Sequence, residues 1–242
     1  MSPFSEIAPY YDQLMTHVQY RTWVDYTKEI IRRAGIKGNR LIDLACGTGE
    51  PTRFLNRAGF DVVGLDSSQE MLNIAQQKMP DVRFIEADIR DFQIAERFDI
   101  AVSYYDSMNY LLKEEDLNDC FSSVYNILNE PGILIFDMNT IHVLKDHWDS
   151  RIVVRENGDL FSIWENGHDP STNISTLKLT LFVKEGRGYL RFRELHKERG
   201  YENGEVLRLL NAVGFKEAVV YHHLTFNPPD DETDRVMFVV LK

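Results

Sequence analysis

One ten-residue segment, from Leu41 to Glu50, constrains the fold of this chain more than any other. It reads Leu-Ile-Asp-Leu-Ala-Cys-Gly-Thr-Gly-Glu, a short apolar strand followed by a turn with two glycines and then a helix start at Pro51. Glycines in a turn directly after a strand let backbone amides come close to a ligand. The segment therefore predicts the first strand and turn of a nucleoside-binding α/β sheet.

The acid within this strand argues against a dinucleotide. A dinucleotide fingerprint would carry a third small residue where this chain has Thr52, and Asp43 would face a negatively charged pyrophosphate. A carboxylate near the glycines suits a ligand with positive charge. S-adenosylmethionine has an ammonium and a sulfonium and no phosphate, so it fits better, and a nicotinamide dehydrogenase is a remote alternative.

The second and third predicted strands also end in acids, Asp66 and Asp88. An acid at the tip of the second strand is the usual partner of ribose hydroxyls in a βαβ nucleoside site. Ser67 and Glu70 then fit a capping box at the start of the next helix. Three strands with an acid at each carboxyl end would surround a nucleoside at the switch point of a doubly wound sheet.

Together these motifs resemble the class I S-adenosylmethionine-dependent methyltransferases. The resemblance rests on Asp-Leu-Ala-Cys-Gly-Thr-Gly at 43–49, on Asp66 followed by Ser-Ser-Gln-Glu-Met-Leu, and on Ala87-Asp88, and it runs from about Tyr10 to the C-terminus. The N-terminal Ala-Pro-Tyr-Tyr-Asp and a long insert after the fifth strand are similar to small-molecule methyltransferases, such as glycine and sugar amine N-methyltransferases.

The resemblance implies roles for individual residues. Asp43 would hold the methionine ammonium through water, and Asp66 would bind both ribose hydroxyls. Asp88 would receive the adenine amino group, with Met71 and Ile89 packing the ring. The expected cofactor-binding set is Tyr11, Asp43, Ala45, Gly47, Gly49, Asp66, Ser67, Met71, Asp88, Ile89 and Tyr104.

Alternation of strands and helices predicts a doubly wound, mostly parallel, seven-stranded Rossmann-like sheet. Strands are expected at 40–45, 61–66, 82–87, 98–104, 133–137, 217–226 and 235–241, and helices at 5–35, 51–58, 68–78, 114–129 and 205–213. Between them the period changes, because Leu177, Leu179, Leu181 and Val183 alternate with polar residues. We therefore expect a methyltransferase domain of residues 1–144 and 201–242, with an antiparallel β insert at 145–200 that covers the substrate or makes a dimer contact.

Candidate catalytic residues lie in three places. Asp106 and Asn109 follow the fourth strand, where the methyl acceptor lies in this fold, and Tyr11 matches a lid tyrosine of the family. His196, in the insert, is the one histidine we nominate as a general base. The Pro-Pro-Tyr and Pro-Cys elements of nucleic-acid methyltransferases are missing after the fourth strand. Asp137 and Asn139 have no evident companion acids, so no metal site is expected.

The charge and composition of the chain limit the kinds of substrate and partner that we expect. The formal net charge of −11 repels a polyanion, which argues against a nucleic-acid substrate. Neither a signal sequence nor a membrane span is evident, and two cysteines form no disulfide framework. We expect a cytoplasmic monomer or homodimer that methylates an N or O atom of a small metabolite. The alternatives are an RNA-modifying methyltransferase and a non-catalytic S-adenosylmethionine-binding module.

Overall fold

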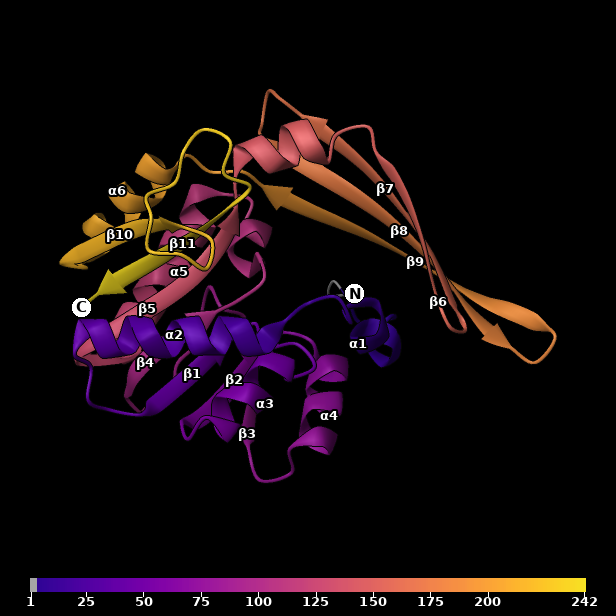
Figure 1. The fold of residues 1–242 in the computed structure, drawn as a ribbon. Coiled ribbons are helices and arrows are strands. Elements are labelled where there is room, and N and C mark those ends of the chain that lie inside the picture. Colours follow the sequence, from indigo (N-terminus) through magenta and orange to yellow (C-terminus); the bar gives the residue numbers. More distant parts are fainter. Residues whose placement is uncertain (1–3) are drawn as a thin grey trace.

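A seven-stranded sheet forms the centre of the molecule in the computed structural model, which describes residues 4–242. Its strands are β1 (Arg40–Leu44), β2 (Asp61–Asp66), β3 (Arg83–Glu86), β4 (Phe98–Ser103), β5 (Leu128–Asn139), β10 (Glu217–His222) and β11 (Arg235–Leu241). They lie in the order β3-β2-β1-β4-β5-β11-β10, and only β11 runs antiparallel to both of its neighbours (Figure 1). The expected doubly wound, mostly parallel sheet is confirmed.

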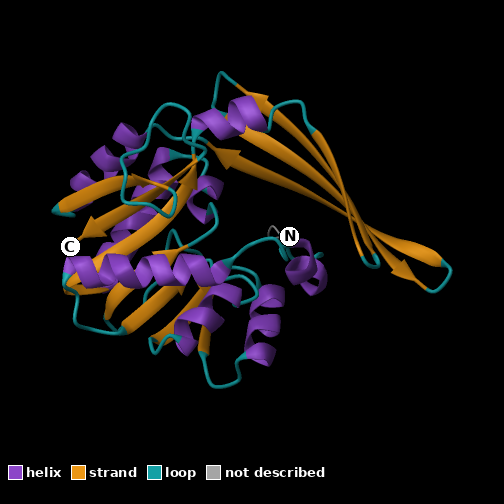
Figure 2. Cartoon of the chain, in the orientation of Figure 1, coloured by secondary structure: helices purple, strands orange, loops and turns teal. Residues whose placement is uncertain are grey.

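Helices cover both faces of this sheet (Figure 2). The long ones are α2 (Tyr20–Ala34), α3 (Glu50–Arg57), α4 (Gln69–Lys78), α5 (Glu114–Ile127) and α6 (Asn203–Val213), and the short ones are η1 (Ala8–Tyr10), α1 (Tyr11–Leu14), η2 (Ser107–Tyr110) and η3 (Val143–His147). Alternate strand residues face opposite sides. Leu41 of β1 thus packs with α2 and α3, whereas its neighbour Ile42 packs with α5 and α6.

The insert is a four-stranded antiparallel meander that projects from the parent sheet as an arm (Figure 1). It consists of β6 (Ile152–Asn157), β7 (Leu160–Asp169), β8 (Ile174–Glu185) and β9 (Gly188–Arg199). One face of the arm packs on the N-terminal segment, where Leu179 and Leu181 meet Ile7 and Leu14 in a third apolar cluster. The N-terminal segment therefore lies between the arm and the parent sheet.

Three local predictions were wrong. The expected helix at 5–35 is broken, because α1 ends at Leu14 and α2 begins at Tyr20. The helix cap is Ser68, whose hydroxyl accepts from the backbone N–H of Met71, and not Ser67. The strand expected at 133–137 is longer at both ends, because β5 already begins at Leu128, where it pairs with Phe98 of β4, and runs to Asn139.

Candidate active site

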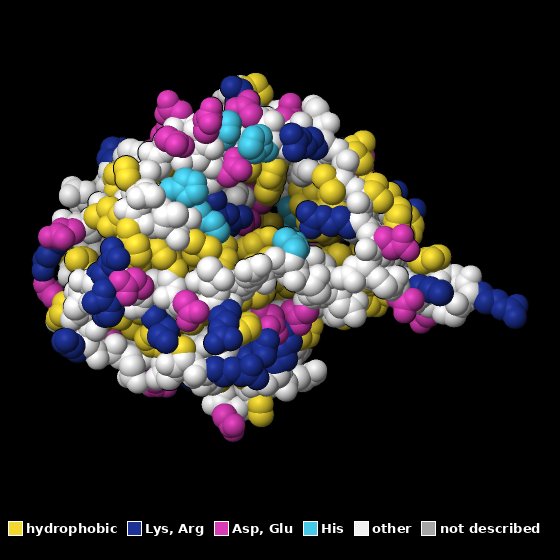
Figure 3. Space-filling view, viewed as in Figure 1, with side chains coloured by type: hydrophobic (Ala, Val, Ile, Leu, Met, Phe, Trp, Pro, Cys, Tyr) yellow, Lys and Arg dark blue, Asp and Glu magenta, His cyan; other side chains and the backbone are white. Residues whose placement is uncertain are grey.

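A cavity of about 700 Å³ lies where the carboxyl ends of the parallel strands, the N-terminal segment and the arm meet. Figure 3 shows the surface hollowed between the parent domain and the arm. Its wall contains nine of the eleven residues expected to bind the cofactor: Tyr11, Ala45, Gly47, Asp66, Ser67, Met71, Asp88, Ile89 and Tyr104. A volume of this size is ordinary for a site that binds small molecules.

The glycine turn and Asp66 form one hydrogen-bonded unit in the wall. Gly47 and Gly49 have φ of +56° and +77°, a region that side chains disfavour. The backbone N–H groups of Gly47 and Ser68 donate to the Asp66 carboxylate over 2.8 and 2.9 Å. Burial raises the pKa of Asp66, while these amides oppose the shift. The carboxylate is therefore held in a fixed orientation in the wall of the cavity.

Asp43 and Gly49 lie outside the wall that residues 4–242 form around the cavity. Asp43 is buried beneath the turn and accepts a hydrogen bond of 2.6 Å from the Thr52 hydroxyl. Burial raises its pKa to about 7, and the nearby Asp66 adds to the shift. A Cβ on Gly49 would come within 2.6 Å of Met79, so this glycine allows α4 to pack against the turn. Asp43 therefore acts from beneath the turn, and Gly49 serves the packing of the turn against α4.

The part of the cavity beside the glycine turn and Asp66, called the cofactor end below, also has apolar side chains in its wall. Met71 of α4 is buried, Ile89 follows β3, and both side chains line the cavity. Asp88 lies beside them, but its carboxylate accepts hydrogen bonds from Arg90 at 2.9 and 2.5 Å. The Arg90 guanidinium lowers the pKa of Asp88. A ligand amino group at Asp88 would share the carboxylate with this arginine, which the sequence did not indicate.

The N-terminal segment is fastened to the glycine turn next to Tyr11. The Thr48 hydroxyl donates to Asp12 over 2.6 Å, and Lys78 of α4 forms an ion pair with the same carboxylate. Tyr11 packs edge-on against Phe4 and lines the cavity. Burial raises its pKa well above the ordinary value. Tyr11 is thus held over the cavity as a neutral phenol.

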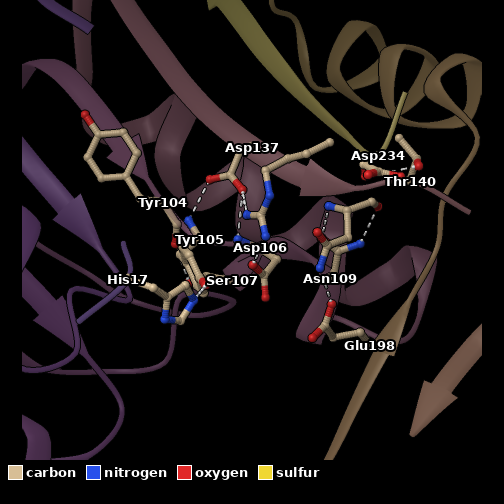
Figure 4. A network of polar contacts seen from close by, with 12 residues as sticks. His17, Tyr104, Tyr105, Asp106, Ser107, Asn109, Asp137, Thr140, Glu198 and Asp234 are labelled. Atoms are coloured by element: carbon tan, nitrogen blue, oxygen red, sulfur yellow. Dashed lines mark hydrogen bonds and ion pairs between the residues drawn. The ribbon is translucent and has the colours of Figure 1, made fainter. Parts of the chain in front are cut away.

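The end of the cavity where the acceptor is expected, called the acceptor end below, is built around a strained turn after β4. Tyr105 and Asp106 both have positive φ, at +60° and +57°, which is costly for residues other than glycine. The Asp137 carboxylate of β5 accepts hydrogen bonds from both backbone N–H groups, at 2.6 and 2.9 Å (Figure 4). Arg235 of β11 pairs with Asp106 over 2.6 Å and also with Asp137. This network holds Asp106 in the cavity wall.

Asn109 does not fit its expected role as an acceptor ligand. Its side-chain amide donates to the carbonyl oxygens of Asn139 and Arg199, and its oxygen accepts from the backbone N–H of Asn139 (Figure 4). It is fully buried and lies outside the cavity wall formed by residues 4–242. Asn109 instead joins η2, β5 and β9, which corrects the prediction.

His196 and two glutamates of β9 lie at the same end. The imidazole lines the cavity, with Nε2 3.0 Å from the Glu194 carboxylate and Nδ1 3.4 Å from the Tyr110 hydroxyl. Glu198 also lines the cavity and accepts a hydrogen bond of 2.8 Å from Asn139. Burial, with repulsion from Asp106, raises the pKa of Glu198 well above its usual range.

Sequence reasoning missed three residues of this site: Arg235, Glu198 and Asp12. Arg235 is the first residue of the last strand and Glu198 is the last but one of β9. Charged residues at strand ends usually face solvent, so neither position indicated a site. Asp12 did carry a signal, since it follows Tyr11 in the Ala-Pro-Tyr-Tyr-Asp segment. Asp137 and Asn139, considered above for a metal, serve the networks of the strained turn and Asn109.

The donor set fits S-adenosylmethionine. The space above Gly47 is open, since a Cβ there would meet no atom within 4 Å, and Asp66 stands beside it with its carboxylate held by amides. Met71 and Ile89 offer apolar surface for a base. This sheet order, glycine turn and acid at the tip of the second strand define a class I S-adenosylmethionine-dependent methyltransferase.

Comparison with known proteins supports the same class of protein. The family model of the methyltransferase domain matches residues 41–132. YqeM of Bacillus subtilis, which is named as a methyltransferase, is 32% identical over 99% of this chain and 97% of its own length. A crystal structure of an S-adenosylmethionine-dependent methyltransferase from Clostridium acetobutylicum superposes with a TM-score of 0.89 at 28% identity, covering 99% of each chain. The chain therefore belongs to the class I S-adenosylmethionine-dependent methyltransferases, and it is an enzyme of this family.

A sugar-modifying relative is also similar. The dTDP-3-amino-3,4,6-trideoxy-alpha-D-glucopyranose N,N-dimethyltransferase of Streptomyces venezuelae is 26% identical over 78% of this chain and 80% of its own length.

Within residues 4–242, no helix combines the length and apolar character needed to cross a membrane.

Proposed function

We propose that this enzyme transfers a methyl group from S-adenosylmethionine to an amine nitrogen of a small molecule. The observation that carries the proposal is the set of acids at the acceptor end of the cavity. Asp106 and Glu198 line it directly, and Glu194 supports His196. Carboxylates suit a substrate that begins as an ammonium and ends as a methylated ammonium, because both ions are positively charged. Similarity to a sugar N,N-dimethyltransferase supports the same conclusion.

An ammonium has no lone pair, so it must lose a proton before the nitrogen can attack a methyl group. Glu198 is buried and lines the cavity, and burial together with repulsion from Asp106 raises its pKa, which makes its carboxylate a stronger base. We assign Glu198 as the group that takes the proton.

The donor supplies a methyl group bound to a sulfonium, which leaves as a neutral thioether when the new N–C bond forms. The protein aligns the acceptor and excludes water. Asp66 would hold the nucleoside part, the backbone of Gly47 would face the methionine part, and Asp43 would compensate positive charge from beneath the turn. The arm, residues 145–200, is the acceptor cover of the parent domain: Leu177, Leu179 and His196 of the arm line the cavity.

An acceptor screen tests the function. Wild-type protein with S-adenosylmethionine would be offered glycine, sarcosine, dTDP-amino sugars, hydroxylated analogues of the same sugars, and bulk tRNA, with S-adenosylhomocysteine formation as the readout. We expect turnover with an amine and none with the matched alcohol. Turnover with tRNA alone, or binding of S-adenosylmethionine without turnover on a broadened amine panel, would contradict the proposal.

The role of Glu198 is tested with the amine found in that screen. Glu198→Gln keeps the shape and the hydrogen bond from Asn139 but removes the base, so kcat should fall about 100-fold, within the usual range for a general base. The acidic limb of the pH profile should disappear with it. Glu156→Gln, on the exposed strand β6, is the control and should behave as wild type. An unchanged pH profile in Glu198→Gln would assign the proton to another group.

A further inference from the structure

A separate cluster of side chains that can bind metals lies at the rim of the cavity. It consists of His142, which immediately precedes η3, His147, which ends η3, and Asp234, which immediately precedes β11. From the geometry of this cluster we infer that the protein has a site for a divalent transition-metal ion of the zinc type. Nothing in the methyl-transfer chemistry above uses these three residues.

The local fold brings the two histidines together. Residues Val143–His147 form a π-helical turn, in which residues five apart in sequence lie above one another. The imidazole rings of His142 and His147 are consequently 4.9 Å apart between centroids. Thr140 fixes the third residue, because its backbone N–H donates to the carbonyl oxygen of Asp234 over 3.0 Å.

The ligand atoms are close enough to share one ion. Nδ1 of His147 lies 3.0 Å and Nε2 of His142 lies 3.9 Å from the same carboxylate oxygen, Oδ1 of Asp234. One ligand atom from each residue fits within 4.8 Å of the others. Ligands at zinc bond lengths of about 2.0–2.1 Å in a tetrahedron lie about 3.3–3.4 Å apart, so small side-chain rotations complete the site.

A fourth residue orients the first histidine. Oδ2 of Asp146 lies 3.1 Å from Nδ1 of His142, which places the ring proton on Nδ1 and leaves the Nε2 lone pair toward Asp234. A carboxylate behind a metal-binding histidine is the usual supporting arrangement, because it fixes the tautomer and raises the basicity of the ligand nitrogen. The contact between Asp146 and His142 is a separate observation in favour of the site, because Asp146 is not one of the three proposed ligands.

Two imidazoles and one carboxylate suit zinc or a neighbouring divalent ion of the first transition series, and they suit magnesium and calcium poorly. Three protein ligands leave at least one coordination position open. His147 and Asp234 also line the cavity, so the ion would lie at its rim. The expectation of no metal came from examining Asp137 and Asn139. In the present cluster Asp234 is far in sequence from the two histidines, and a spacing of five between histidines is not a familiar helical metal motif.

Calorimetry with zinc chloride tests the site on tag-free, chelator-treated full-length protein. We expect one zinc ion per chain, and a visible absorption band when cobalt(II) is used instead. His147→Ala and Asp234→Asn should each weaken zinc binding about 100-fold, and Asp146→Ala about 10-fold, in line with the effect of supporting residues. His222→Ala removes another exposed histidine outside the cluster and should leave zinc binding unchanged.

Each variant is checked by circular dichroism and by S-adenosylhomocysteine binding, so that loss of zinc is separated from loss of fold. Wild-type protein without a zinc heat would overturn the inference, as would full affinity in His147→Ala and Asp234→Asn or an equal loss in His222→Ala. None of these readouts depends on methyl transfer, so the result stands whether or not an amine is the acceptor.

Discussion

The two ends of the cavity are built in different ways. The cofactor end comes from one continuous part of the chain, the successive units β1-α3, β2-α4 and β3, and its central acid, Asp66, is held by backbone amides nearby. The acceptor end joins Asp106 to Arg235, 129 residues later, through paired charges. The first end depends on local backbone geometry, and the second on tertiary packing that brings charged side chains together.

Removing Arg235 should have the largest effect and would show how far the acceptor end depends on paired charge. Arg235→Met keeps the length of the side chain but leaves Asp106 and Asp137 as buried, unpaired carboxylates. Loss of one member of a buried charge network costs about 3–5 kcal/mol of unfolding free energy. Urea denaturation measures it.

The control for this variant is Arg208→Met, which breaks an exposed ion pair with Glu114 and should cost less than about 1 kcal/mol. Equal losses in the two variants would mean that the Arg235 network adds nothing beyond a surface pair. The comparison between the two ends of the cavity would then lose its energetic basis.

At the cofactor end, Asp66→Ala should weaken S-adenosylhomocysteine binding by roughly 1–3 kcal/mol, because buried ribose hydroxyls lose a charged acceptor. Asp66→Asn should cost less, since its carbonyl oxygen still accepts a hydrogen bond. Asp61→Ala, at the exposed start of the same strand, is the matched control. Isothermal titration that finds wild-type affinity in Asp66→Ala would remove this residue from the site.

The pH dependence of Asp43 gives a third test. Its folded-state pKa of about 7 lies above the unfolded value of about 3.9, so the folded chain holds the proton between these values. Stability from this group is therefore present below about pH 4 and is lost as the pH rises toward about 7. Relative to wild type, the ligand-free Asp43→Asn protein should gain roughly 2–3 kcal/mol between pH 5 and pH 8. Parallel stability curves for the two proteins would show that Asp43 titrates normally.

The smallest effect is expected at the junction of the two ends. Tyr11→Phe keeps the ring packed over the cavity but removes the hydroxyl, so cofactor affinity should stay within about 2-fold while transfer slows by about 3- to 10-fold. Tyr10→Phe, whose ring packs against Phe192, is the control. A normal single-turnover rate with a lowered melting temperature would mean that Tyr11 only anchors the N-terminal segment.

The same contrast explains what the sequence could predict. Asp43, Gly47, Asp66 and Asp88 follow a fixed order along successive strands, so the pattern predicted both the sheet and one end of the cavity. The matched family model, residues 41–132, covers that same part of the chain. The alternation around Leu177 likewise predicted the antiparallel arm.

The acceptor end was less accessible to this reasoning. Asp106 and Asn109 lie in the same turn region. The Asn109 side chain forms hydrogen bonds with backbone groups, whereas Asp106 lines the cavity. That difference depends on where β9 and β11 return, which the sequence near residue 106 does not encode. Arg235 and Glu198 were missed for the same reason, because their partners lie far away in the chain.

The position of β11 has a consequence for the growing chain. This strand lies between β5 and β10, although it is the last of the seven to leave the ribosome. Until it emerges, one edge of β5 is open and Asp106 and Asp137 have no arginine to face. The first strands can pair during translation, but the acceptor end can form only after Arg235 has been made. A nascent chain stalled before that residue would therefore have a glycine turn and an acid ready for the cofactor, together with an exposed strand edge of the kind that chaperones shield.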